Sequence, residues 1–186
     1  MQLIQVFDNK SSQQFLQVPL RIYKDDPNYI RPLDKDVNEI FDLKKNKAFR
    51  FGECNRWLLM DDDNNLIGRI AAFVNKRYKN KGDDQPTGGI GFFECINNQE
   101  AADMLFDVAK NWLMQRGMEA MDGPINFGER DRWWGLVVEG FKPPIYLMNY
   151  NLPYYQKLFE NYGFKIFYNQ VCWHLFVQTR LSDKFY

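Results

Sequence analysis

A chain of 186 residues can bury one sizeable core but is too short for two, which predicts a single domain over residues 1–186. Its 24 basic and 24 acidic residues balance, so the net charge attracts neither nucleic acid nor an anionic membrane. The sequence has no run of about 18 apolar residues and no signal-peptide pattern at its start, which predicts a cytoplasmic protein. The 3 cysteines are far apart in the sequence, which favours neither a disulfide framework nor a zinc site.

The first half of the sequence predicts a strand, a helix and a hairpin. Residues 3–7 alternate as a strand would. A helical pattern that opens at Ser11-Ser12 is expected to stop at Pro19, because proline lacks the amide that a helix interior needs. Residues 57–60 and 66–74 are apolar and flank a polar turn, which predicts two antiparallel strands.

The middle of the chain predicts a strand that runs directly into a helix. Residues 88–96 open with glycines and are rich in aromatic and β-branched residues, which is typical of a buried strand. Asn97 is expected to cap the helix, with Glu100 reaching back to the free amide, and Gly117 marks the helix end. A strand-to-helix junction leaves unpaired amides that can hold an anion, so this junction is a candidate site.

The last third predicts a short strand, an irregular segment, a helix and a final strand. Residues 118–121 fit a strand, and residues 126–149 form an irregular excursion rich in glycine, proline and aromatic residues. Pro153 opens a helix that stops at Gly163, and residues 164–177 predict a long strand or a bent strand pair. This order predicts an α+β fold in which helices cover a mixed, mostly antiparallel sheet.

Several stretches resemble the GCN5-related N-acetyltransferase (GNAT) superfamily and, more narrowly, a bacterial family of GNAT-like proteins. They are Tyr23-Lys24-Asp25-Asp26-Pro27-Asn28-Tyr29, Leu66-Ile67-Gly68-Arg69-Ile70-Ala71-Ala72, Gly91-Phe92-Phe93-Glu94, Gly117-Met118 with Gly123-Pro124-Ile125-Asn126-Phe127, Glu139-Gly140-Phe141 with Pro143-Pro144, Tyr150-Asn151 with Tyr154-Tyr155, and Leu158-Phe159-Glu160-Asn161-Tyr162-Gly163-Phe164. The likeness spans nearly the whole chain. It implies a GNAT-like acyl-CoA N-acyltransferase fold in which acetyl-CoA or another acyl-CoA acylates an amine and no metal is needed. A fold does not by itself settle the activity.

The resemblance places the coenzyme pyrophosphate on the amides of the strand-to-helix junction, where small residues let the backbone approach. The matching positions here are Ile96, Gln99, Glu100, Ala101, Ala102, Asp103 and Met104. Ala102 and Met104 replace smaller residues of the family pattern. Glu100 and Asp103 add two negative charges, which oppose phosphate by on the order of 1 kcal/mol each. The alternative is an ordinary helix start whose acidic groups favour the helix dipole.

The resemblance also implies two catalytic residues. Glu94 stands on the central strand, where such enzymes often place the carboxylate that takes the amine proton. Phe159 occupies the position of the tyrosine that often protonates the leaving thiolate, so Tyr155, one turn earlier on the same face, or Tyr162 is the candidate substitute. The alternatives are a solvent-facing Glu94 on a half-exposed strand and a Tyr155 that only packs in the core.

Other features leave the activity open. Residues 61–65 imitate the start of a calcium loop but lack its glycine and its final glutamate, which favours a polar turn. The basic run 76–81 fits a solvated loop better than a phosphate contact, and His174 has no nucleophile motif beside it. The Trp133–Tyr146 region fits a cleft wall, or a patch for a homodimer or an additional domain. Two hypotheses remain: an N-acyltransferase for an unknown amine, with a degenerate pyrophosphate loop, and a non-catalytic ligand-binding or protein-interaction domain.

Overall fold

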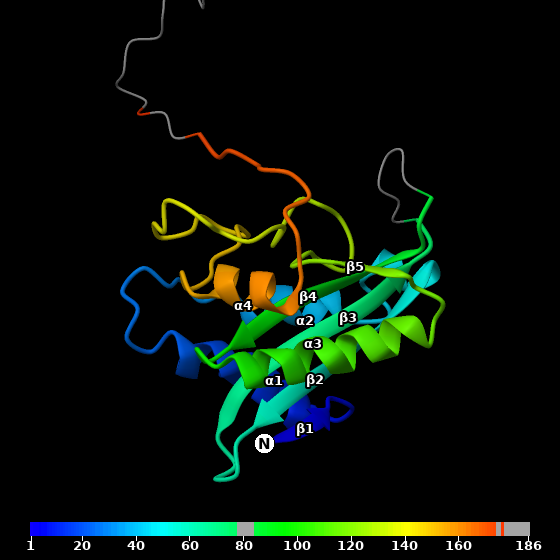
Figure 1. The fold of residues 1–186 in the computed structure, drawn as a ribbon, viewed down its shortest axis with the longest axis horizontal. Helices are drawn as coiled ribbons and strands as arrows, with labels where there is room; N and C mark the ends of the chain where they lie inside the picture. The colour runs from blue at the N-terminus through cyan, green and yellow to red at the C-terminus, as the bar shows by residue number, and fades with distance from the viewer. Residues whose placement is uncertain (78–83, 174–175, 177–186) are drawn as a thin grey trace, which may run out of the picture.

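One five-stranded sheet forms the centre of the fold in a computed structural model that describes residues 1–77, 84–173 and 176. Its strands, which lie in chain order, are β1 (Gln2–Gln5), β2 (Gly52–Met60), β3 (Leu66–Asn75), β4 (Thr87–Cys95) and β5 (Ala120–Asp122). The first three pairs are antiparallel, and β4 pairs with β5 in parallel. The helices are α1 (Asn9–Ile22), α2 (Asp34–Ile40), the 3-10 helix η1 (Lys47–Arg50), α3 (Gln99–Met114) and α4 (Tyr155–Tyr162) (Figure 1). The predicted α+β plan is confirmed.

The sheet is buried on both faces, with α1 on one face and α3 on the other (Figure 1). Successive side chains of a strand point to opposite faces, and β2 follows this rule closely. Trp57 and Leu59 join the buried cluster that contains α3 and α4, whereas Leu58 and Met60 join the cluster around α1. Each polar side chain between these layers therefore needs a partner inside the protein.

The start of α1 differs from the prediction. Asp8 caps the helix by accepting the Ser11 amide at 2.7 Å, so the helix begins before the predicted Ser11-Ser12 start. The predicted stop at Pro19 is also wrong, because the helix continues to Ile22 with Pro19 inside it. Proline here removes one hydrogen bond, the one to the carbonyl of Phe15, and packing in the core outweighs that loss.

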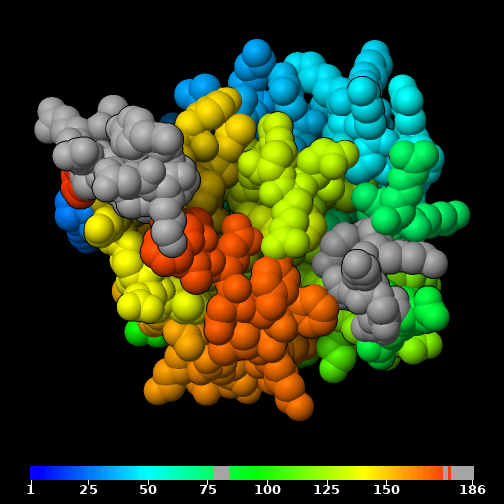
Figure 2. Space-filling model, turned by 90° about the horizontal axis from the view of Figure 1, so that it is seen from above, coloured from blue at the N-terminus to red at the C-terminus, as the bar shows by residue number. Residues whose placement is uncertain are grey.

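The C-terminal part agrees with the prediction only in places. Helix α4 ends at Gly163 in the left-handed conformation, as predicted, and residues 126–149 contain neither helix nor strand. The final strand is wrong over residues 164–173, which are irregular and run beside residues 126–149 (Figure 2). The rest of that predicted strand lies largely outside the described residues. A strand needs a neighbour for its backbone hydrogen bonds, and no described strand lies alongside this segment.

Three aromatic rings join the sheet to α3 and α4. Phe106 of α3 stacks on Phe93 of β4 with ring centroids 4.6 Å apart, and Phe159 of α4 lies 5.0 Å from Phe93 and 4.9 Å from Phe106. Such pairs add stabilisation beyond the burial of their area. None of the helices among the described residues is long and apolar enough to cross a membrane.

Phe106 is fully buried, so Phe106→Ala should lower the free energy of unfolding by about 3–5 kcal/mol, the usual cost of a large core cavity. Urea unfolding of the wild-type and variant proteins measures the change. Phe7→Ala is the matched control, because Phe7 is 80% exposed and its truncation should cost less than about 0.5 kcal/mol. Equal losses in the two variants would contradict the placement of Phe106.

Candidate active site

The sheet opens between β4 and β5. The two strands pair only over Thr87–Gly89, and one further bond joins the Ile125 amide to the Ile90 carbonyl at 2.8 Å. Gly91 permits this approach, since a side chain there would overlap the Ile125 carbonyl. Phe92 follows with a φ of 51°, next to a register shift against β3, and such an irregularity bends a strand. The last residues of β4 are therefore left without β5 beside them.

Helix α4 occupies the far end of this opening. The Tyr155 hydroxyl accepts the amide of Cys95 at 3.1 Å, and the Tyr154 hydroxyl donates to the carbonyl of the same residue at 2.7 Å. Two tyrosine side chains thus satisfy the edge of β4 where a paired strand would otherwise do so. The opening is bounded by β5 at one end and by α4 at the other.

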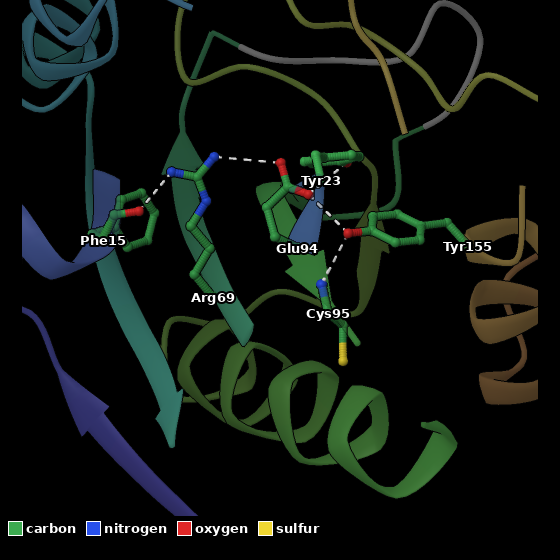
Figure 3. Close-up of polar contacts among 6 residues, drawn as sticks. All are labelled: Phe15, Tyr23, Arg69, Glu94, Cys95 and Tyr155. Carbon is green, nitrogen blue, oxygen red and sulfur yellow. Dashed lines mark hydrogen bonds and ion pairs between the residues drawn. The ribbon is translucent and has the colours of Figure 1, made fainter. Parts of the chain in front are cut away.

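Glu94 lies at the centre of a buried polar cluster (Figure 3). Its Oε2 accepts hydrogen bonds from the hydroxyls of Tyr23 at 2.7 Å and Tyr155 at 2.8 Å, and its Oε1 lies 3.4 Å from Nη2 of Arg69. Sequence reasoning named Glu94 and Tyr155 separately as catalytic candidates, and the structure brings them into direct contact. Glu94 is not solvent-facing, so that alternative is wrong.

Tyr155 reaches Glu94 through the opening in the sheet. Its ring packs edge-on against Phe93 at 5.4 Å, within the core on the α3 face. Glu94 follows Phe93 in the strand and so points to the opposite face, toward α1. The tyrosine can cross from one face to the other only because β5 is absent from this edge of β4. The splayed sheet is therefore a condition for the cluster.

Arg69 is a member of the cluster that sequence reasoning named only within a family motif, without a role. It is 5% exposed, its Nη1 donates to the Phe15 carbonyl at 2.8 Å, and its guanidinium lies 4.7 Å from the Phe15 ring centroid. The Phe15 carbonyl is available because Pro19, four residues later in α1, has no amide to donate to it. Proline in the helix therefore supplies the acceptor that orients Arg69 toward Glu94. A basic residue within the apolar strand 66–74 was the signal in the sequence.

Burial raises the pKa of Glu94, although Arg69 and the two tyrosine hydroxyls act to lower it. Burial, followed by the charge of Glu94, raises the pKa of Tyr23 and of Tyr155 well above the usual value. Both hydroxyls therefore keep their protons and donate to the carboxylate. A carboxyl group with a raised pKa is better matched to proton transfer near neutral pH.

An outer layer of tyrosines covers the cluster. Tyr29 stacks on Tyr23 with ring centroids 4.1 Å apart, and the Tyr150 ring lies 5.9 Å from that of Tyr23. The Tyr150 hydroxyl donates to Asp26 at 2.7 Å, which joins the α1–α2 connection to the irregular segment 126–149 and its flank. These contacts separate Glu94 from solvent on the side away from α4.

The junction between β4 and α3 is exposed and keeps open amides. Asn98 caps α3 by accepting the Ala101 amide at 2.9 Å, so the prediction that Asn97 is the cap is wrong, and with it the capping box to Glu100. The amides of Asn97, Gln99 and Glu100 meet no acceptor within the described part of the chain. Exposed amides at the start of a helix can hold an anion.

The side chains proposed for this loop point in different directions. Ala101 and Ala102 are fully buried and Met104 packs against the core, so none of the three fills the junction. Gln99 donates to Asp103 at 2.8 Å and to the Leu158 carbonyl at 3.1 Å, which ties the loop to α4. Ile96 and Glu100 are exposed at the junction. The assignment of these residues to a coenzyme stays a prediction, with Glu100 as the unpaired acidic side chain among them.

A broad groove of about 2580 Å³ lies beside this site. It runs between β5, segment 126–149, α4 and residues 164–173, whose surfaces lie together in Figure 2. Much of its lining is apolar: Met118, Met121, Leu136, Val137, Met148, Phe159 and Phe164. Tyr150 links the groove to the outer tyrosine layer. Of the Trp133–Tyr146 region, Trp134 lines the groove, whereas Trp133 packs on Phe92 at 5.5 Å. The role of the Trp133–Tyr146 region as a patch for a second subunit or an additional domain stays a prediction.

Some candidates fall outside the described residues. His174 and most of the basic run 76–81 belong to this group. Residues 1–77, 84–173 and 176 include no cluster of three or more histidine, cysteine, aspartate or glutamate side chains able to hold a metal ion.

The fold defines the class: the chain has the GNAT acetyltransferase fold, as the resemblance implied. Aminoglycoside antibiotic 6'-N-acetyltransferase AAC(6')-IG from Acinetobacter haemolyticus matches 95% of this chain and 99% of its own, with a TM-score of 0.56 and 14% identity. AAC(6')-Iy, solved with the bisubstrate analogue CoA-S-monomethyl-acetylneamine, matches 92% of this chain and 98% of its own, with a TM-score of 0.52 and 14% identity.

Two curated proteins are similar in sequence. Protein YghO of Escherichia coli K12 is 30% identical over 165 residues, which is 87% of this chain and 41% of that protein. The bacterial ceramide synthase of Caulobacter vibrioides is 28% identical over 153 residues, which is 82% of this chain and 39% of that enzyme. The chain thus spans about two fifths of the length of these relatives. No family model matches the sequence.

The pKa of Glu94 predicts a dependence of stability on pH. Because this pKa is raised above its ordinary value of 4.5, the folded state binds the proton more tightly than the unfolded state does. The resulting stabilisation is fully present below that ordinary value and is lost as the pH rises through the folded-state pKa. Wild-type protein should therefore lose stability relative to Glu94→Gln as the pH rises from 4.5 toward neutrality.

Urea unfolding at a series of pH values measures this difference. Glu160→Gln is the matched control, because it makes the same substitution at an exposed position of α4 outside the buried cluster. A constant difference for Glu94→Gln would show that Glu94 does not titrate differently in the folded state.

Proposed function

We propose that this protein is an acyl-CoA-dependent N-acyltransferase in which Glu94 takes the proton of the acceptor amine. The observation that carries the proposal is the buried carboxylate at the opening of the sheet, held by the hydroxyls of Tyr23 and Tyr155. Its raised pKa suits a base that works near neutral pH. A structure with the same fold was solved with a bisubstrate analogue that contains coenzyme A, which supports an acyl-CoA donor.

The donor would bind across the junction and the opening. The amides of Asn97, Gln99 and Glu100 would face the pyrophosphate, and the acyl-bearing arm would enter between β4 and β5 toward Tyr155. The Glu100 carboxylate opposes this binding by charge, in contrast to Asp103, which Gln99 engages. The backbone amides of the junction therefore suit the pyrophosphate better than its side chains do.

The reaction forms a C–N bond and breaks a C–S bond. The amine nitrogen attacks the thioester carbonyl, its proton passes to Glu94, and the thiolate leaves and is protonated in turn. Tyr155 lies in the opening and keeps its proton, so it is our candidate for protonating the thiolate. Most of the acceleration in such a reaction comes from holding amine and thioester together.

The groove favours a lipophilic substrate. Its apolar lining begins at β5 and reaches Tyr150, so an alkyl chain would be buried there while its polar end lies near the tyrosine layer. The name of the relative from Caulobacter vibrioides points in the same direction, because a ceramide is the amide of a fatty acid and a long-chain amino alcohol. We therefore propose that the acyl donor, the acceptor amine or both carry a long chain.

Purified protein tests this proposal with palmitoyl-CoA and acetyl-CoA as donors and with sphinganine and ethanolamine as acceptors. Free thiol and the amide product are measured together. We expect transfer with at least one long-chain substrate, and Glu94→Gln should lower the rate by about 10²–10⁴-fold, the usual contribution of a general base. Tyr146→Phe, which removes a surface hydroxyl bonded to Asp36 outside the groove, should leave the rate unchanged.

Absence of amide with every pair would overturn the enzyme assignment and favour a non-catalytic binding domain. One observation favours a non-catalytic domain. The hydroxyls of Tyr154 and Tyr155 bond to the backbone of Cys95 and so fill one end of the opening.

The charge of Glu100 gives a separate prediction for binding. Glu100→Gln should tighten palmitoyl-CoA binding by about fivefold, which corresponds to about 1 kcal/mol of relieved repulsion from the pyrophosphate. Calorimetry measures the dissociation constants. Glu39→Gln, on α2, is the matched control and should not change them. An unchanged dissociation constant for Glu100→Gln would argue against pyrophosphate at this junction.

A further inference from the structure

Three groups surround the Glu94 carboxylate, and they come from different elements. Arg69 comes from β3, Tyr155 from α4, and Tyr23 follows the last residue of α1 (Figure 3). The two hydroxyls share one oxygen, Oε2, at 2.7 and 2.8 Å. A proton that arrives from one tyrosine can therefore leave through the other after crossing a single carboxylate oxygen.

The two tyrosines face different sides of the site. Tyr155 packs with Phe93 and accepts the Cys95 amide, so its hydroxyl lies at the opening between β4 and α4. This is the side on which the proposed function places the thioester. Tyr155 is thus on the donor side of Glu94.

Tyr23 lies toward the outer tyrosine layer. It stacks on Tyr29 and lies beside Tyr150, and both of these rings are only partly buried. Tyr150 also lines the groove, which places the end of the groove on the same side as Tyr23. Tyr23 itself is 3% exposed, so the proposed amine would reach its hydroxyl only if the outer layer moved aside. This is the acceptor side of Glu94.

We propose that Tyr23 is a further catalytic residue and that Tyr23, Glu94 and Tyr155 form one proton path from the acceptor amine to the leaving thiolate. The inference rests on the proposed function. As the C–N bond forms, the amine proton passes to Oη of Tyr23 while the Tyr23 proton passes to Oε2 of Glu94. As the C–S bond breaks, the Tyr155 proton passes to the thiolate and Glu94 returns its proton to Tyr155. The path starts and ends with both hydroxyls protonated and Glu94 ionised, and it needs no other reagent.

Arg69 and the buried surroundings fit this role. Arg69 bonds to Oε1 alone, so it holds the carboxylate in place and leaves Oε2 to the two tyrosines. Because the pKa of each tyrosine is raised, both hydroxyls are protonated at rest, as the proposed proton path requires. Tyr23 is separated from Glu94 by 71 positions in the sequence and meets it only through the fold.

The test compares Tyr23→Phe, Tyr155→Phe and Tyr146→Phe with the wild type, using palmitoyl-CoA and sphinganine. We expect Tyr23→Phe to lower kcat by about 10²-fold, within the range of general acid–base catalysis, with KM for palmitoyl-CoA unchanged. The dependence of kcat on the fraction of D₂O should be curved in the wild type, where several protons move together. It should become straight in Tyr23→Phe. Tyr146→Phe removes a hydroxyl that also lies 2.7 Å from a carboxylate, that of Asp36, and should behave as the wild type because Tyr146 lies outside the groove.

The possible outcomes distinguish a failure of the proton path, called the relay below, from a failure of the proposed N-acyltransferase function. If the wild type transfers acyl groups and Tyr23→Phe keeps at least half of its kcat, the relay is overturned and the proposed function stands. The relay is also overturned if kcat falls but the D₂O dependence stays curved, because a loss of packing would do this. If the wild type forms no amide, the proposed function fails and the relay falls with it.

Discussion

The candidate site depends on how one carboxylate is kept inside a sheet that is covered on both faces. A buried charge without partners costs several kcal/mol, and a buried ion pair often stabilises a protein less than apolar side chains of the same volume would. Glu94 meets this constraint with one cation and two hydroxyls, yet burial still raises its pKa. The arrangement is thus a poor way to gain stability. Its chemistry, a base whose hydrogen bonds all lead to groups that can donate or hold protons, is the better explanation for its presence.

The opening of the sheet between β4 and β5 determines which residues form the cluster around Glu94. If β5 continued beside β4 to Cys95, its backbone would take the hydrogen bonds that Tyr154 and Tyr155 now make, and the Tyr155 hydroxyl could not reach Glu94. Because β4 pairs with β5 only over Thr87–Gly89, other residues can contact the Glu94 carboxylate. The same opening is the place where the proposed thioester would enter. The composition of the cluster and the proposed entry of the thioester thus both depend on where one strand leaves the sheet.

Much of the fold followed from local patterns, whereas half of the cluster did not. Apolar alternation and turn residues predicted the β2–β3 hairpin, β4 and the helices α3 and α4, because these signals lie within a few residues of each other. Resemblance to a family named Glu94 and Tyr155. Tyr23 and Arg69 stood in stretches that carry the resemblance, but their roles were missed because these arise from contacts 71 and 25 positions away in the sequence. The errors at the helix starts have local causes, because Asp8 and Asn98 cap their helices in place of the expected residues. The error at Pro19 does not, because tertiary packing carries α1 past this residue.

Pro19 shows how a residue that is unfavourable locally can be useful at the site. In an isolated helix it would remove a hydrogen bond and strain the preceding turn. In this protein the carbonyl it leaves free, that of Phe15, accepts Nη1 of Arg69, and the Phe15 ring lies against the same guanidinium. Arg69 is held from the α1 side and can meet only one oxygen of Glu94, which leaves the other to two tyrosines. Pro19 thus frees the carbonyl that orients Arg69, and the orientation of Arg69 leaves Oε2 of Glu94 to the tyrosines.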